Sequence, residues 1–310
     1  MTMLGVDPLL HLAQSQISQG NAVQAIETLK QALSQDPDRA EAHALLALCL
    51  LEMRRIDAAA HEARLGLAAD PLSPLGHYVQ GAVQLGQRKL VEAESSYRTL
   101  LDLEPGNPEN YRAMARLLEV KGNKTDAEAH LNKALELAPD DPQTLTALGE
   151  MQLAAGRIDE AQRLADDALR IQPEHLDGLV LRGSVALRRG DVKTAREHAI
   201  WALHIDAGDP GALRLIAEIK SRTNWFLGLW WRYSVWMGEL GAGRAIFVLL
   251  GAFVVYQAAT IWAGQHGQSD LASVIRLLWL GICVYTWVGP GLFQRSLQRE
   301  IGNVALKSDF

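Results

Sequence analysis

Apolar residues recur at helical spacing over the first two thirds of the chain, in pairs of stripes separated by a short break. Three sets of positions repeat with a step of 34 residues. One set is proline: Pro37, Pro71, Pro105, Pro139 and Pro173. A second is alanine: Ala25, Ala59, Ala93, Ala127, Ala161 and Ala195. A third is small: Ala13, Ala47, Gly81, Ala115, Gly149 and Gly183. Since a single pair of short helices cannot bury its apolar faces alone, the pattern predicts six helix–turn–helix units that stack around one continuous core.

This pattern resembles that of the tetratricopeptide repeat (TPR) family, which has a 34-residue period with small residues at positions 8 and 20 and proline at position 32. The resemblance covers residues 6–209, although the aromatic residue typical of position 4 is mostly replaced. Residues 210–222 continue the phase and are predicted to form a helix that covers the last unit. The resemblance implies an all-α solenoid with a concave groove, lined by the first helix of each unit, that holds a protein or peptide segment.

By the geometry of the family, positions 2, 5, 9 and 12 of each unit face the groove. The candidate partner-binding residues at these positions are Ala44, Leu48, Leu51, Tyr78, Ala82, Leu85, Arg112, Arg116 and Glu150. An apolar floor beside two arginines one turn apart suits a segment with bulky apolar anchors and a nearby carboxylate. The alternative is that the small and apolar residues only pack between helices, or face a neighbouring element of the same chain. Some TPR proteins hold a carboxyl terminus with lysine and asparagine, but here Leu10 and Gln14 occupy those positions in the first unit, which argues against such capture.

The C-terminal third has a different hydrophobic pattern. Residues 245–263 are an uncharged run of 19 residues, and residues 271–293 are a second apolar run with one charge, Arg276. Each run is long enough to cross a hydrocarbon core of roughly 30 Å as a helix. Seven of the eight tryptophans lie at or beyond Trp225, several of them near the ends of these runs, as at a membrane interface. The sequence predicts a two-helix transmembrane hairpin; the alternative is a pair of buried helices in a soluble domain.

Seven basic residues flank the outer ends of the two runs, against one on the loop side, so both chain ends are predicted to be cytoplasmic. Aromatic and aliphatic residues surround most of a helix at 224–241, which predicts either an interfacial helix or an elbow packed on the array. The predicted organisation is therefore an array at 1–222, an aromatic linker helix at 223–243 and a transmembrane hairpin with a short basic tail at 244–310. The predicted location is the bacterial inner membrane.

The charge of the chain and the absence of known motifs argue against several classes of function. Up to residue 219 the chain has 22 Lys and Arg against 32 Asp and Glu, which argues against a nucleic-acid partner. No phosphate-binding loop, catalytic triad motif or metal-binding motif occurs. His43 and His77, at equivalent repeat positions, are interpreted as packing residues. Cys49 and Cys283 both lie in apolar runs and are interpreted as buried. We therefore expect no enzymatic activity, catalytic residue, cofactor or metal.

The sequence favours a membrane-anchored protein–protein interaction scaffold, with a protein segment and the lipid bilayer as its partners. The alternative is a regulatory or assembly subunit of a membrane enzyme or transport complex. In that case the hairpin would be the functional part, and other membrane proteins would be partners. A soluble TPR protein with a helical C-terminal domain is a third possibility.

Overall fold

The computed structural model describes residues 5–223, 253–263, 265 and 273–281. The described residues form helices and turns, and none of them is in a β-strand. They fall into two compact units, divided between Ala155 and Gly156. The expected all-α repeat architecture is confirmed.

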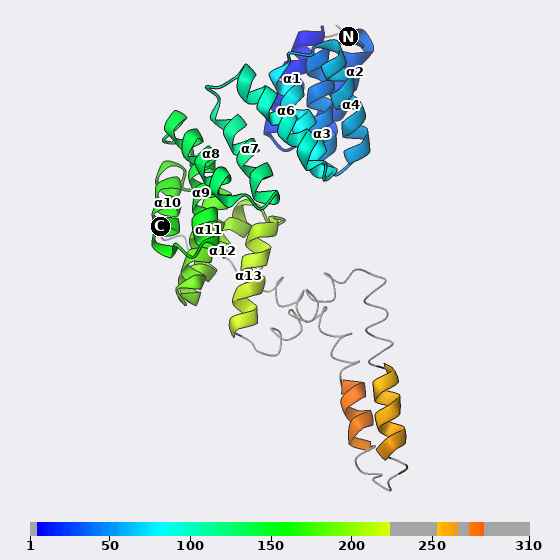
Figure 1. The fold of residues 1–310 in the computed structure, drawn as a ribbon, viewed down its shortest axis with the longest axis vertical. Helices are drawn as coiled ribbons and strands as arrows, with labels where there is room; N and C mark the ends of the chain where they lie inside the picture. The colour runs from blue at the N-terminus through cyan, green and yellow to red at the C-terminus, as the bar shows by residue number, and fades with distance from the viewer. Residues whose placement is uncertain (1–4, 224–252, 264, 266–272, 282–310) are drawn as a thin grey trace. The chain divides into compact units, whose positions relative to one another are not determined.

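The described part of the first unit contains nine helices (Figure 1): α1 (Val6–Ser18), α2 (Ala22–Gln35), α3 (Ala40–Glu52), α4 (Ile56–Ala69), α5 (Pro74–Gly86), α6 (Leu90–Leu103), α7 (Pro108–Val120), α8 (Lys124–Leu137) and α9 (Pro142–Ala154). Successive helices pack as pairs, α1 with α2, α3 with α4, α5 with α6 and α7 with α8. The first helices of neighbouring pairs also touch, α1 with α3, α3 with α5 and α5 with α7. The helix pairs of this unit are therefore stacked, with the first helix of each pair next to the first helix of the following pair.

The described part of the second unit contains α10 (Ile158–Ile171), α11 (Leu176–Arg188), α12 (Val192–Ile205) and α13 (Pro210–Thr223), followed by helical segments at 253–263 and 273–281. Helices α11 and α12 form a pair, and α13 packs on both of them. Ala212, Leu215, Ile216 and Ile219 of α13 are buried in one cluster with residues of α11 and α12. The apolar face of the last pair is therefore covered, as expected for residues 210–222.

In most units, the residue just before the first helix caps that helix with its side chain. At 34-residue intervals, these capping side chains accept hydrogen bonds from backbone N–H groups of the first turn: Ser73, Asn107, Asp141, His175 and Asp209. Such caps satisfy donors that the helix itself leaves unpaired. The proline two residues before each of Ser73, Asn107, Asp141 and His175 cannot extend the preceding helix, so the sequence marks both sides of the boundary.

The turn inside each unit requires a left-handed residue. Gly20, Gly122, Gly156 and Gly190 have φ angles of 74°, 80°, 81° and 86° there. Arg54 and Arg88 occupy the same position in the second and third units with φ angles of 58° and 62°. Because a Cβ atom makes this conformation costly by roughly 1–2 kcal/mol, the two arginines hold a strained geometry that the helix packing imposes.

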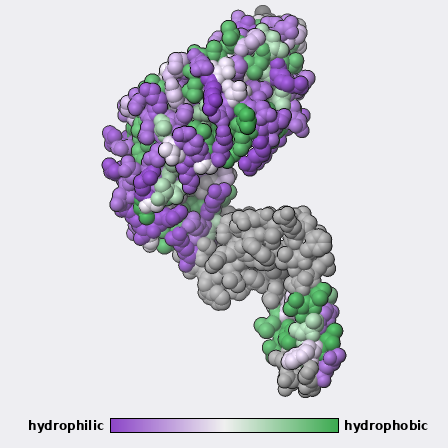
Figure 2. All heavy atoms as spheres, viewed as in Figure 1, coloured by the Kyte–Doolittle hydropathy of each residue, from purple (hydrophilic) through white to green (hydrophobic). Residues whose placement is uncertain are grey.

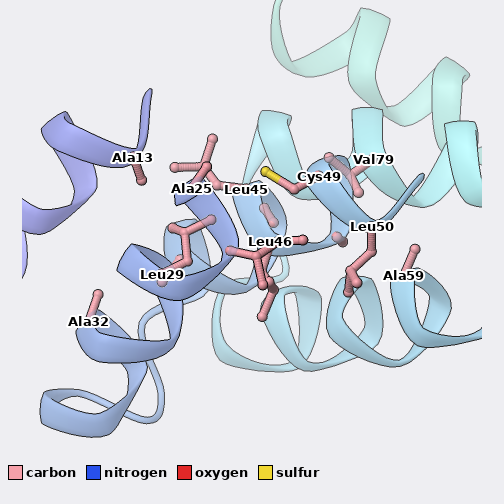
Figure 3. Packing of buried hydrophobic residues seen from close by; sticks show 14 of the residues in the cluster. Ala13, Ala25, Leu29, Ala32, Leu45, Leu46, Cys49, Leu50, Ala59 and Val79 are labelled. Atoms are coloured by element: carbon pink, nitrogen blue, oxygen red, sulfur yellow. The ribbon is translucent and has the colours of Figure 1, made fainter. Parts of the chain in front are cut away.

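Small residues set the distance between paired helices. All six alanines of the 34-residue series are 0% exposed. At the third series, a Cβ atom on Gly81 would lie 2.5 Å from Cε1 of Tyr97, so only glycine fits beside that ring. The core of the first unit forms around these contacts, with side chains from α1 to α5 meeting in one cluster (Figure 3). Leu29 and Ala32 of α2 are fully buried there.

The described residues only partly cover the predicted membrane hairpin. The parts of the two runs that fall within them, 253–263 and 273–281, are helical. Among the described residues, none of the helices has both the length and the apolar character needed to cross a membrane. The predicted linker helix at 224–241 and the remaining parts of both runs lie outside the described residues, and the boundaries at 222 and 243 stay predictions.

Replacing Ala127 with leucine is expected to destabilise the fold by about 1–3 kcal/mol, because a contact this close cannot absorb extra methylenes. Ala127 is 0% exposed on α8, whereas Ala129 of the same helix is exposed. Ala129→Leu is therefore the matched control and should change stability by less than about 0.5 kcal/mol. Urea unfolding followed by circular dichroism measures both. Equal stability of the two variants would show that Ala127 is not at a close contact.

Candidate partner-binding surface

The nine candidate groove residues all lie in the first unit, on the first helices of successive pairs. Ala44, Leu48 and Leu51 belong to α3; Tyr78, Ala82 and Leu85 to α5; Arg112 and Arg116 to α7; and Glu150 to α9. Since α3 packs on α5 and α5 on α7, the residues of these three helices belong to one contiguous region. Glu150 is exposed on α9.

The apolar candidates differ in how much surface they offer. Ala44 is 1% exposed and belongs to the core cluster, so its prediction as a groove residue is wrong. At that point the helices approach so closely that a methyl group is fully covered. Leu48, Leu51 and Tyr78 are half-buried and pack against the core with one side. Ala82 and Leu85 are also half-buried, so the accessible apolar surface is mainly on α5 and the end of α3.

Tyr78 is positioned by a second tyrosine that the sequence did not single out. Tyr97 of α6 is 3% exposed, and its ring centroid lies 6.4 Å from that of Tyr78 at an interplanar angle of 55°. Burial raises the pKa of both phenols. The room for the Tyr97 ring comes from Gly81, which has no side chain. The sequence signal for this contact was a glycine in the small-residue series, Gly81, together with a tyrosine on the following helix.

Charged residues of α7 lie next to this tyrosine pair. After burial, the negative charge of Glu109 is the main influence that raises the pKa of Tyr78, while Arg112 and Arg116 act in the opposite direction. Arg116 also acts on Tyr97. Tyr78 of α5 and the charged residues of α7 therefore lie close enough to interact electrostatically.

The two arginines of α7 have different roles. Arg112 donates from Nη1 to the side-chain oxygen of Gln143, and Nη1 lies 3.5 Å from Oδ2 of Asp141. Asp141 is the residue that caps α9, accepting from the backbone N–H of Thr144 at 3.1 Å. Its side chain and that of Arg112 are each only 20% exposed. The expectation that both arginines are exposed binding groups is therefore wrong for Arg112, which links α7 to the start of α9.

Arg116, in contrast, is exposed and makes no hydrogen bond or ion pair with any described residue. One turn further along α7, Glu119 has a raised pKa, because partial desolvation outweighs the opposing influence of Arg116 and Lys124. Arg116 therefore presents an unpaired guanidinium beside the tyrosine pair, where a carboxylate of another molecule can accept from it.

The histidines at position 4 have a structural role. In three consecutive units, the side chain at this position bonds to the backbone oxygen of the proline that ends the previous unit: His43 with Pro37 at 2.8 Å, His77 with Pro71 at 2.9 Å and Tyr111 with Pro105 at 3.0 Å. Nδ1 of His43 also lies 2.7 Å from Oε2 of Glu62. Over the described ranges, no cluster of His, Cys, Asp and Glu could hold a metal ion.

Replacing Arg112 with glutamate is expected to destabilise the first unit by roughly 1–3 kcal/mol, since it places a carboxylate against Asp141 and removes the link to Gln143. Arg116→Glu makes the same charge change one turn away on an exposed site and should alter stability by less than about 0.5 kcal/mol. Thermal unfolding of both variants tests this difference. A tolerated charge reversal at Arg112 would contradict its assignment as a link between helices.

Comparisons with known proteins agree with this geometry. Models of the tetratricopeptide repeat match residues 16–83, 84–151 and 146–210. A search of curated protein sequences gives no match. Among solved structures, PilF of Pseudomonas aeruginosa is 21% identical, with 69% of this chain and 97% of that chain covered and a TM-score of 0.52. The thermophilic TPR protein TTC0263 of Thermus thermophilus is 25% identical, with 59% and 100% covered and a TM-score of 0.55.

PilW, a widely conserved type IV pilus biogenesis factor, is 19% identical, with 68% of this chain and 98% of that chain covered and a TM-score of 0.55. At this identity the likeness to PilF and PilW concerns the fold. The family models, however, match nearly all residues from 16 to 210, and the described helices recur with the 34-residue step. The chain belongs to the tetratricopeptide repeat family.

Proposed function

We propose that this protein is a membrane-attached scaffold whose TPR array binds a segment of a partner protein at the surface around Tyr78 and Arg116. TPR proteins are protein–protein interaction scaffolds, and no catalytic constellation among the described residues argues for another activity. The observation that carries the proposal is the unpaired guanidinium of Arg116 beside a tyrosine pair whose inner ring is buried.

The charge around Arg116 supports a partner that supplies its own carboxylate. Residues 1–175 contain 16 Lys and Arg against 26 Asp and Glu, so carboxylates are in excess in this part of the chain. Arg116 nevertheless has no ion-pair partner among the described residues, whereas Arg112 and Lys121 of the same region do. In such a surface an apolar anchor packed beside Tyr78 and Leu85 supplies most of the affinity, and the ion pair with Arg116 supplies orientation and association rate.

Membrane attachment is supported by the exposed surface of the two C-terminal helical segments (Figure 2). Nine large apolar side chains of these short segments are at least 44% exposed: Phe253, Val254, Val255, Ile261, Trp262, Val274, Leu277, Leu278 and Leu280. Exposed apolar surface of this density is costly in water and favourable in lipid. We propose that both segments belong to the predicted spans, 245–263 and 271–293.

The two segments also contact each other. The ring of Tyr256 stacks on that of Trp279, with centroids 4.8 Å apart and an angle of 15°, and Phe253 lies 6.2 Å from Trp279. This pairing accounts for Trp279, which lies too deep in the predicted span for an interfacial tryptophan. It favours an antiparallel hairpin with aromatic side chains between the helices. In the proposed topology both chain ends are cytoplasmic and the membrane is the bacterial inner membrane.

Arg116→Glu is expected to abolish capture of the native partner while the protein stays folded and membrane-attached, because the reversed charge repels the partner carboxylate. Arg64→Glu, an identical change at an exposed site on α4, is the control and should retain the partner. The measurement is co-purification from mild detergent followed by mass spectrometry. Recovery of the same partners in the same amounts from both variants would contradict the proposed surface. Loss of partners only on removal of residues 224–310 would favour the assembly-subunit alternative.

Single cysteines are expected to show the proposed topology. In a Cys283→Ser background, Ser269→Cys should react with a membrane-impermeant reagent applied from the periplasmic side, because the loop between the two runs lies outside. Lys307→Cys should react only after the membrane is opened. The chain should also resist extraction with alkaline carbonate. Reaction of both positions in sealed cells, or release by carbonate, would contradict the anchor.

A further inference from the structure

Charge and tryptophan content both change at the end of the repeat array. Residues 1–175 have a net charge of −10, whereas residues 176–223, which contain α11 to α13, have 8 Lys and Arg against 6 Asp and Glu. The same stretch contains Trp201, the one tryptophan that the sequence holds before residue 225. Trp201 is 45% exposed, although tryptophan is mostly buried in folded domains.

The exposed face of α12 combines these features. It consists of Lys193, Arg196, Glu197, Trp201, His204 and Ile205, all of them exposed, and is called the α12 face below. Trp201 and Ile205 are one turn apart, so their side chains lie together, and Ile205 is 44% exposed. In the five preceding units, the position of Trp201 is Gln31, Leu65, Thr99, Lys133 and Asp167. At this repeat position, an aromatic residue therefore occurs only in the last unit.

We infer that the α12 face rests on the surface of an anionic lipid bilayer, with Trp201 and Ile205 inserted at the headgroup level and with Lys193 and Arg196 reaching the phosphates from the opposite flank of the helix. This inference rests on the membrane attachment proposed above, and it adds a second contact that orients the array. Tryptophan has an apolar body and a polar N–H, which suit the headgroup region, and each nearby Lys or Arg adds attraction to anionic lipid.

Chain length makes this contact available. Helix α13 ends at Thr223, and 21 residues separate it from the first predicted span at 245. Even fully extended, such a connection reaches only about 70 Å, so the last unit stays close to the bilayer. A tethered surface needs little intrinsic affinity to be occupied, because its effective concentration is high.

The size and charge of the face favour lipid over a protein partner. One exposed tryptophan and one isoleucine cover far less than the roughly 1,200–2,000 Å² that a stable protein–protein interface buries. Residues 1–175 would be repelled by anionic headgroups, whereas the α12 face has two basic residues and one acidic residue, Glu197, whose Oε1 lies 4.0 Å from Nζ of Lys193. Anionic lipid therefore repels residues 176–223 least, and this part of the array is also the nearest in sequence to the predicted spans.

The test uses the full chain with a spin label on His204→Cys in a Cys283→Ser background. Cys49 does not interfere, because it is 1% exposed and burial raises the pKa of its thiol to about 11. The matched control is Glu136→Cys on α8, an exposed residue at the equivalent position two units earlier. Both proteins are reconstituted into vesicles of phosphatidylcholine alone or mixed with phosphatidylglycerol. Accessibility to lipid-soluble oxygen and to a water-soluble nickel complex reports the position of each label.

We expect the label on α12, but not the control, to gain oxygen accessibility and lose nickel accessibility in vesicles with phosphatidylglycerol. Trp201→Ala should reverse this change. Replacing Lys193 or Arg196 with glutamine should lower the ratio of inserted to water-exposed label by about fivefold per charge. Circular dichroism confirms that these exposed substitutions leave the fold intact.

Each contrary outcome has a definite meaning. Identical accessibility of the two labels in phosphatidylglycerol vesicles overturns the inference and leaves the proposed function standing. Insertion that does not depend on Trp201 or on anionic lipid overturns it as well. Protection of the label in native membranes but not in lipid vesicles assigns the α12 face to a protein and also overturns it. Carbonate extraction of the same vesicles after the label measurement tests the anchor separately, so failure of one proposal is distinguishable from failure of the other.

Discussion

The close approach of paired helices at fully covered small residues is the constraint on which the rest of the structure depends. Six alanines at 34-residue intervals are 0% exposed, and Gly81 leaves room for the ring of Tyr97. These contacts fix the distance and angle between the paired helices, so the backbone of the turn between them must adopt the conformation that this geometry requires. Arg54 and Arg88 therefore adopt left-handed φ angles where other units have glycine. Packing outweighs local backbone preference here, since many covered contacts oppose one strained residue per turn.

The same packing determines which side chains remain available for a partner. Ala44 is buried in the core. Tyr78 packs against the core with one side of its ring and is partly exposed on the other. Arg112 is used to connect α7 with the capped start of α9, so its charge supports the scaffold on which Arg116 is presented. Two arginines one turn apart thus differ: Arg112 links two helices, and the proposed role in recognition falls to Arg116.

The repeat array could be read from the sequence almost entirely, because period and phase are properties of the whole array and tolerate the loss of single residues. The site could be read only in outline. Repeat position predicts the helix face that a residue occupies, but it does not reveal contacts with the next unit. The link from Arg112 to Gln143 and Asp141 spans about thirty residues and depends on the helix crossing geometry. Tyr97 and the stacking partner of Trp279 were missed because the position of a side chain along the sequence does not reveal which ring it meets on the neighbouring helix.

Charge and aromatic content change together along the chain. Residues 1–175 have an excess of acidic residues, and anionic lipid would repel such a surface. Towards residue 223 the acidic excess ends, and an exposed tryptophan appears for the first time. Beyond it, the described segments expose apolar side chains around most of their surface. A change of this kind along the sequence is consistent with the proposed membrane attachment through the C-terminal third of the chain.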